Sequence, residues 1–229
     1  MKFDAVLFDA ADTLFTTRGS VGEIYASVAR KFRSTASPAD IQSAFERHFP
    51  RSGPLSTDNE KQWWKDVVHR VFTDVGTVQS FDVFFDQVYE LFRDSRGWML
   101  FPETREVLEA LRSRGLKLGV VSNFDSRLYA VLKDLRILEF FDGVTICSET
   151  GFAKPQPEIF RAATLSLKVR PDRTLYTGDS LVDDYIAGRD AGLETWLLDR
   201  SDRYAAMKSV RRIATLRDLL TITGITPNS

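Results

Sequence analysis

The chain has 229 residues, and its content of 43% hydrophobic and 28% charged residues is typical of a globular protein. With 31 lysines and arginines against 32 aspartates and glutamates, it lacks the strong positive charge of nucleic-acid-binding proteins, and no apolar run reaches the roughly 18 residues of a membrane span. The single cysteine, Cys147, excludes an intrachain disulfide, so we expect a cytoplasmic protein that binds neither nucleic acid nor membrane.

Residues 3–8 form the first predicted element, a nearly continuous apolar run that ends at Asp9. Such a run is typical of a parallel strand that is buried on both faces of its sheet. The polar residues that follow it are therefore expected at one edge of the sheet.

Residues 18–97 carry apolar side chains at helical spacing and few strand signals. One helix start is marked by Ser37 as the N-cap and Pro38 at the first helical position. We expect the adjacent Trp63 and Trp64 to pack in the interior of this segment. The pattern predicts an all-helical domain, inserted into a larger core.

From about residue 100 onward, predicted helices and strands alternate. This alternation is typical of an α/β fold with a doubly wound, Rossmann-like parallel sheet. We assign residues 1–17 and 98–229 to this core and residues 18–97 to the inserted helical domain. The expected strands are 116–121, 144–147, 174–177 and 193–198, and the expected helices are 104–114, 125–135, 157–165, 182–191 and 215–223.

Polar side chains gather where the predicted strands end. In an open parallel sheet, ligands bind beyond the carboxyl ends of the strands. The candidate residues there, including one lysine from a loop before a helix, are Asp9, Ser122, Asn123, Lys154, Asp179, Asp183 and Asp184. Together they provide carboxylates, a hydroxyl, an amide and an ammonium group, which are the groups that phosphoryl transfer and Mg²⁺ binding require.

Each of these residues alone has an ordinary structural explanation. Asp9 is a plausible turn residue, Ser122 and Asn123 are typical helix caps, and Lys154 suits a solvated loop. Because they come from separate segments that meet at one edge of the sheet, their joint occurrence favours a shared phosphate and metal site.

Four motifs in the chain resemble those of the haloacid dehalogenase-like hydrolase superfamily. They are FDAADTL at 8–14, VSN at 121–123, KPQPEIF at 154–160 and GDSLVDD at 178–184, in the family's order. The helical segment between the first two motifs is similar to that family's cap.

By this resemblance, Asp9 is the nucleophile that forms an aspartyl-phosphate. The resemblance further implies that Asp9, Asp179 and the backbone carbonyl of Ala11 hold Mg²⁺. Asp184 is expected to support the metal through its waters, with Asp183 as the alternative.

The same resemblance implies a phosphate-binding set made of Ser122, Asn123 and Lys154. Lys154 is also expected to offset the negative charge of Asp9 during catalysis. The implied substrate is a small phosphorylated metabolite; the sequence identifies neither that metabolite nor the oligomeric state.

The chain departs from the family's phosphatases at one position. Those enzymes carry an aspartate two residues after the nucleophile as general acid and base, and this chain has Ala11 there, with Asp12 at the next position, which is usually glycine. Loss of a general acid typically costs ~10²–10⁴ in rate. Asp12 is a candidate replacement, but neighbouring extended residues point to opposite sides, which favours a structural role.

Three functions are consistent with these residues. The first is a Mg²⁺-dependent phosphatase, which the absence of a general acid makes slow or selective for good leaving groups. The second is a non-catalytic or regulatory phosphate-binding protein, which Ala11 favours. The third is a 2-haloacid dehalogenase; the dehalogenases that resemble this chain need no metal and lack a carboxylate at the position of Asp179, so Asp179 argues against it.

Overall fold

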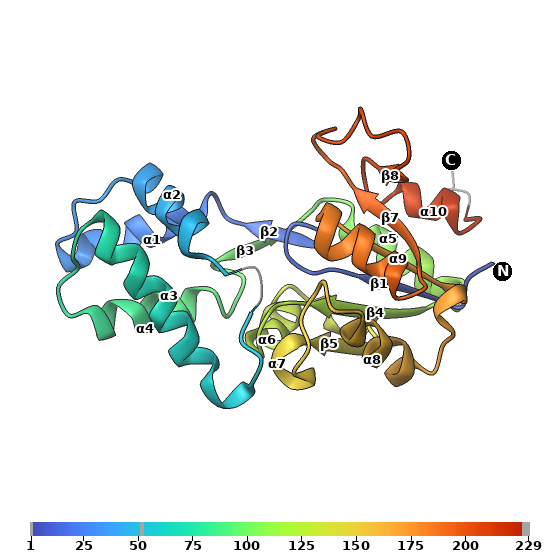
Figure 1. The fold of residues 1–229 in the computed structure, drawn as a ribbon, viewed down its shortest axis with the longest axis horizontal. Helices are drawn as coiled ribbons and strands as arrows, with labels where there is room; N and C mark the ends of the chain where they lie inside the picture. Colours follow the sequence, from blue (N-terminus) through green and yellow to red (C-terminus); the bar gives the residue numbers. More distant parts are fainter. Residues whose placement is uncertain (1, 51–52, 226–229) are drawn as a thin grey trace.

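A parallel sheet of six strands forms the core of the molecule, and the computed structural model describes residues 2–50 and 53–225 (Figure 1). The strands are β1 (Ala5–Phe8), β4 (Lys117–Ser122), β5 (Gly143–Ile146), β6 (Thr174–Gly178), β7 (Glu194–Leu198) and β8 (Arg212–Ile213). They lie in the order β5-β4-β1-β6-β7-β8, and all neighbouring pairs run parallel. The strands β4 and β5 therefore lie on one side of β1, and β6, β7 and β8 lie on the other.

Helices cover both faces of this sheet: α5 (Thr104–Ser113), α6 (Arg127–Asp134), α8 (Pro157–Leu167), α9 (Ala187–Asp190) and α10 (Asp218–Ile222). Alternate residues of β1 pack on opposite faces, with Val6 and Phe8 in the cluster that contains α5, α6 and α10. Leu7 packs in the other cluster, with α8 and α9. The predicted doubly wound α/β architecture is therefore confirmed.

Four α-helices follow one another between residues 21 and 91: α1 (Val21–Ala29), α2 (Pro38–His48), α3 (Glu60–Val75) and α4 (Phe81–Leu91). They form a group beside the sheet rather than on one of its faces (Figure 1). The predicted start of α2 is confirmed, because the Ser37 side chain accepts a hydrogen bond from the N–H of Asp40 and Pro38 is the first helical residue. None of the helices that the structure describes combines the length and apolar character needed to cross a membrane.

A two-stranded antiparallel sheet joins the helical group to the core. Its strands, β2 (Phe15–Thr17) and β3 (Trp98–Leu100), flank the helical segment and pair with each other. These two short strands and β8 are not among the elements predicted from the sequence. All four helices fall within 18–97, and the assignment of that segment as a separate domain stays a prediction. Residues 1, 51–52 and 226–229 of the assigned domains lie outside the described residues.

The segment after β6 differs from the single helix that the sequence predicts. Residues Leu181–Ile186 form a wider π-helical turn, and only Ala187–Asp190 continue as the α-helix α9. The carbonyl of Ser180 accepts hydrogen bonds from two successive N–H groups, at 3.1 Å from Asp184 and 3.0 Å from Tyr185. Such π-turns are frequent at functional sites, because they redirect a side chain without ending the helix.

Candidate active site

Asp9 is the first residue after β1. Its N–H extends the strand pairing by donating to the carbonyl of Thr177 at 2.9 Å. The chain then turns sharply, because the carbonyl of Ala10 accepts from the N–H of Leu14 at 2.8 Å and Asp12 adopts a left-handed φ of +59°. This turn leaves the Asp9 side chain at the carboxyl edge of the sheet, with the residue only 7% exposed.

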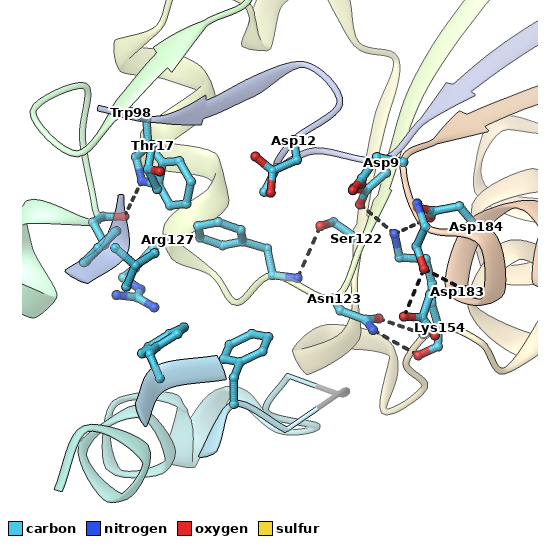
Figure 2. Close-up of a pocket in the computed structure, with 18 of the residues that line it drawn as sticks. Asp9, Asp12, Thr17, Trp98, Ser122, Asn123, Arg127, Lys154, Asp183 and Asp184 are labelled. Carbon is cyan, nitrogen blue, oxygen red and sulfur yellow. Dashed lines mark hydrogen bonds and ion pairs between the residues drawn. The ribbon is translucent and has the colours of Figure 1, made fainter. Parts of the chain in front are cut away.

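Lys154 lies against Asp9 in this site (Figure 2). Its Nζ donates to Asp9 Oδ1 at 2.6 Å and to Asp184 Oδ1 at 2.7 Å, and it lies 3.3 Å from the hydroxyl of Tyr176. The lysine is 4% exposed, so it is a buried cation between two carboxylates. Burial of the ammonium group is the largest single influence and opposes its charged form, but the attraction of Asp184 and Asp9 and the hydrogen bonds to them together outweigh it and raise the pKa of Lys154.

The side chain of Asn123 holds the backbone of Lys154. Its Oδ1 accepts from the Lys154 N–H at 2.7 Å, and its Nδ2 donates to the Lys154 carbonyl at 2.9 Å (Figure 2). Asn123 thus positions the lysine, while its predicted contact with phosphate stays a prediction. Ser122, at the end of β4, accepts from the N–H of Phe124 at 3.3 Å. Its predicted contact with phosphate, in which its hydroxyl would donate, also stays a prediction.

Asp179 and Asp184 reach the same edge from β6 and the π-helical turn. Asp184 is 1% exposed, and its Oδ2 accepts from the N–H of Ser180 at 2.9 Å. A Cβ atom added at Gly178 would lie 2.2 Å from the Cγ of Asp184, so only glycine lets this carboxylate lie against the end of the strand. The same close approach brings Asp184 within reach of Lys154.

The carboxylates of Asp9, Asp179 and Asp184 each place one oxygen within 4.8 Å of the others, so the three could hold one metal ion. Three oxygen donors of this kind suit a hard cation such as Mg²⁺, which favours carboxylate ligands. Asp183 instead accepts from the hydroxyl of Ser180 at 3.4 Å, and Ser180 caps the turn by accepting from the Asp183 N–H. The geometry favours Asp184 over Asp183 as the residue that supports the metal.

The family model for haloacid dehalogenase-like hydrolases matches residues 3–192, which include β1, β4, β6 and every site residue described above. The chain belongs to this family. Curated relatives named haloacid dehalogenase-like hydrolase domain-containing protein 3 are similar along most of their length. The mouse protein is 36% identical, covering 88% of this chain and 84% of the relative, and the Xenopus laevis protein is 33% identical, covering 86% and 85%.

Solved structures of other haloacid dehalogenase-like proteins share the fold. A phosphatase from Thermococcus onnurineus superposes with a TM-score of 0.68 at 24% identity, covering 97% of this chain and 98% of the other. An L-2-haloacid dehalogenase from Xanthobacter autotrophicus superposes with a TM-score of 0.75 at 16% identity, covering 97% and 98%. Because a phosphatase and a dehalogenase match alike, the fold does not distinguish these two activities.

The site concentrates negative charge. Burial raises the pKa of Asp179 to about 8, and repulsion from Asp9, Asp184 and Asp12 adds to that rise. Burial also raises the pKa of Asp9 to about 6, although Lys154 opposes the rise. Carboxylates forced together in this way are stabilised by a divalent cation, which favours their ionised forms.

Mg²⁺ is expected to stabilise the folded chain more strongly as the pH rises. Because the pKa values of Asp9 and Asp179 are raised on folding, their contribution to stability is present at low pH and is lost as the pH rises from about 4 towards 8. Mg²⁺ bound to the ionised carboxylates would reverse this loss. At one fixed concentration, 100 times the Kd at pH 8, we expect Mg²⁺ to raise the Tm by roughly 5–10 °C at pH 8 and much less at pH 5.5, as measured by thermal denaturation. Equal increments at both pH values would contradict binding at these carboxylates.

Ala11 and Asp12 show how the first motif departs from the family's phosphatases. Ala11 lines the pocket beside Asp9, so a methyl group stands where those enzymes have a general acid. Asp12 keeps the left-handed conformation that a glycine adopts readily at this position, and its Oδ1 accepts from the hydroxyl of Thr16 at 2.8 Å. Asp12 also lines the pocket, where Figure 2 shows it between Asp9 and Thr17. Its hydrogen bond to Thr16 is consistent with the structural role that the sequence favours.

The pocket continues from the carboxylates into a cavity of about 370 Å³ between the core and the helical group. Most of the residues that form the wall of this cavity were not predicted as site residues. The aromatic residues that line it are Tyr25, Phe45, Phe49, Trp64, Phe92, Trp98 and Phe124. Trp64, expected only in the helical interior, packs against the apolar cluster and also faces this cavity. Helical periodicity identified the five of these residues that lie within 18–97 as apolar, but it cannot separate the face that packs from the face that borders a pocket.

Proposed function

We propose that the chain is a Mg²⁺-dependent phosphatase that acts on a small phosphorylated metabolite through an aspartyl-phosphate at Asp9. The observation that carries this proposal is the buried Asp9 carboxylate, which lies 2.6 Å from the Lys154 ammonium and shares a cluster of oxygens with Asp179 and Asp184. A nucleophile beside a fixed cation and a metal-binding cluster is the arrangement that phosphoryl transfer requires.

The charges around the pocket support a divalent cation as part of the site. Five carboxylates line it, together with one lysine and an arginine that is already paired with Asp125, among the residues that the structure describes. A phosphate dianion would meet excess negative charge there without a further cation. Mg²⁺ would be held by Asp9, Asp179 and the carbonyl of Ala11, supported by Asp184, and when bound it would neutralise charge on the phosphate oxygens.

The protein's own residues would then act on the substrate in a defined order. Asp9 attacks phosphorus, the bond from phosphorus to the leaving oxygen breaks, and water later displaces the phosphoryl group from Asp9. Lys154 and the hydroxyl of Ser122 donate to phosphate oxygens, while Asn123 keeps Lys154 in place. A buried and pre-positioned lysine of this kind stabilises charge without reorganising during the reaction.

Replacing Asp12 by asparagine is expected to change turnover on alkyl and aryl phosphates to the same small extent, roughly threefold or less, because a structural residue donates no proton to the leaving group. The measurement is kcat for one alkyl and one aryl phosphate in the variant and the unmodified chain. A selective loss with the alkyl substrate would assign the missing proton donor to Asp12.

A non-catalytic phosphate-binding protein is the second candidate, because Ala11 removes the group that usually protonates the leaving group. A 2-haloacid dehalogenase is disfavoured by the carboxylate of Asp179, which such chemistry does not need. The test that separates the three is a screen of phosphorylated metabolites with Mg²⁺ and with a chelator, with 2-chloropropionate as the dehalogenase substrate. Phosphate release that requires Mg²⁺ supports the proposal, whereas chloride release in the presence of chelator would replace it.

A further inference from the structure

We propose that the cap side of the pocket binds a flat aromatic ring, so that the substrates of this site are aryl phosphate monoesters. This inference rests on the proposed phosphatase function and names its substrate class. Two independent observations carry it: the composition of the cavity wall and the chemistry that Ala11 permits.

The wall opposite Lys154 is built from aromatic rings that contact one another. Phe49 stacks on Phe45 with ring centroids 5.2 Å apart and lies 5.7 Å from the ring of Trp64. From the core, the rings of Trp98 and Phe124 lie 5.5 Å apart. Cap and core thus each contribute rings to one cavity, and ring faces and edges of this kind favour another aromatic group between them.

The polar groups on this wall are already engaged within the protein. The Trp98 Nε1 donates to the carbonyl of Phe92 at 3.1 Å, and the hydroxyl of Thr17 donates to the carbonyl of Gly19 at 2.6 Å. The donors of both residues are therefore used within the protein, and only the Thr17 hydroxyl oxygen can still accept a hydrogen bond from a ligand.

Arg127 also lines the cavity, but it too is engaged in hydrogen bonds within the protein (Figure 2). Its Nε and Nη2 donate to Asp125 at 2.9 and 2.6 Å, and its guanidinium lies over the rings of Tyr89 and Trp64 at 4.0 and 5.0 Å. The Nε1 of Trp64 donates to the same Asp125 carboxylate. The arginine charge is thus neutralised locally, and the pair supports the aromatic wall instead of attracting an anionic ligand.

A sugar or polyol phosphate would bury several hydroxyl groups against this wall without partners, which typically costs about 1–3 kcal/mol for each group. Tyr25 and Thr17 are the exceptions: the Tyr25 hydroxyl makes no hydrogen bond to the residues that the structure describes, and the Thr17 oxygen can still accept, so each could pair with one polar substituent. An aromatic ring displaces water from the apolar wall without this cost. The wall therefore favours binding of an aromatic phosphate over binding of a sugar or polyol phosphate.

The absence of a general acid at Ala11 favours the same class of substrates, the aryl phosphates. When an oxygen of Asp9 attacks an aryl phosphate, the phosphorus–oxygen bond breaks and its electron pair leaves on the phenolate oxygen. A phenol has a pKa near 10, so the phenolate departs without a proton from the enzyme, whereas an alkoxide does not. Water then attacks phosphorus, the bond to Asp9 breaks, the carboxylate re-forms, and the released phosphate takes the proton.

Binding of unreactive phosphonates tests this inference without requiring turnover. Benzylphosphonate replaces the bridging oxygen of phenyl phosphate with carbon, and methylphosphonate lacks the ring. With saturating Mg²⁺, calorimetry is expected to give an affinity for benzylphosphonate that is roughly 10- to 100-fold higher than for methylphosphonate or inorganic phosphate. Equal affinities for all three would overturn the ring site while leaving the phosphatase proposal intact. No binding of any of the three would overturn both.

A substitution on the wall locates the effect. Phe49 is 43% exposed, so replacing it by alanine leaves little buried cavity in the folded chain. We expect Phe49→Ala to reduce the preference for benzylphosphonate over methylphosphonate roughly 3- to 10-fold. Val83→Ala is the matched control, because Val83 is 52% exposed on α4 and lies outside the cavity wall. An unchanged preference in Phe49→Ala, or an equal loss in Val83→Ala, would contradict a ring bound against this wall.

Discussion

Replacing Asp9 by asparagine is expected to reduce kcat by roughly 10⁴-fold or more, because the amide cannot act as the nucleophile in phosphoryl transfer. The side chain keeps its size, so a loss of activity reports chemistry instead of packing. The measurement is the rate of Mg²⁺-dependent phosphate release, with the most active substrate from the metabolite screen. Turnover that survives in Asp9→Asn would remove Asp9 from the role of nucleophile.

The stability of the Asp9→Asn variant supplies its control. The substitution removes one of three mutually repelling carboxylates, although it also removes an ion pair with Lys154. These two effects oppose each other, so we expect the metal-free Tm to change by only a few degrees. The stabilisation by Mg²⁺ should become smaller, because one of the ionised ligands is lost. A variant that fails to fold would be replaced by Asp9→Ser, which also lacks the carboxylate.

Replacing Ala11 by aspartate is expected to raise kcat on alkyl phosphates by ~10²–10⁴, since it restores a general acid beside the nucleophile. Ala11 already lines the pocket next to Asp9, so a carboxylate at this position faces the substrate. The gain on aryl phosphates should be smaller in the first step, because a phenolate leaves without help. The measurement is the single-turnover rate of alcohol or phenol release, together with kcat, for matched alkyl and aryl substrates.

The same substitution is expected to change the time course of the reaction. Without a base to activate water, hydrolysis of the aspartyl-phosphate in the unmodified chain should be slower than its formation from an aryl phosphate. Rapid mixing should then give a burst approaching one phenol per active site, followed by slow turnover. In Ala11→Asp the burst should disappear. No gain with alkyl phosphates and no change in the burst would show that the missing acid is not what limits this site.

The principal parts of the fold could be predicted from residue patterns because they depend on burial. The apolar run of β1 and the alternation of strands and helices both require a sheet covered on two faces, and the structure has one. The short strands β2 and β3 were missed because three-residue strands contain too few residues for a periodic signal. The π-helical turn after β6 was missed because its apolar spacing resembles that of an ordinary helix.

The candidate site could be predicted in its residues but not in its contacts. Asp9, Asp179 and Asp184 were singled out because they follow strands whose carboxyl ends meet, and their oxygens do lie together. The sequence pattern does not reveal that Asn123 holds the backbone of Lys154. An asparagine in a motif can bind either a ligand or another part of the protein, and the residue type alone does not tell which. The aromatic lining of the cavity could not be predicted from the sequence, because it combines residues from the helical group and the core that are far apart along the chain.

The formation of an aspartyl-phosphate is the central claim, and mass spectrometry of the acid-quenched protein tests it most directly. The chain would be mixed with an aryl phosphate and Mg²⁺, quenched within the burst, digested and analysed for the peptide that contains Asp9. We predict one added phosphoryl group on Asp9, which is absent when a chelator replaces Mg²⁺. An active protein whose phosphoryl group lies on another residue, or that carries none during the burst, would contradict the account.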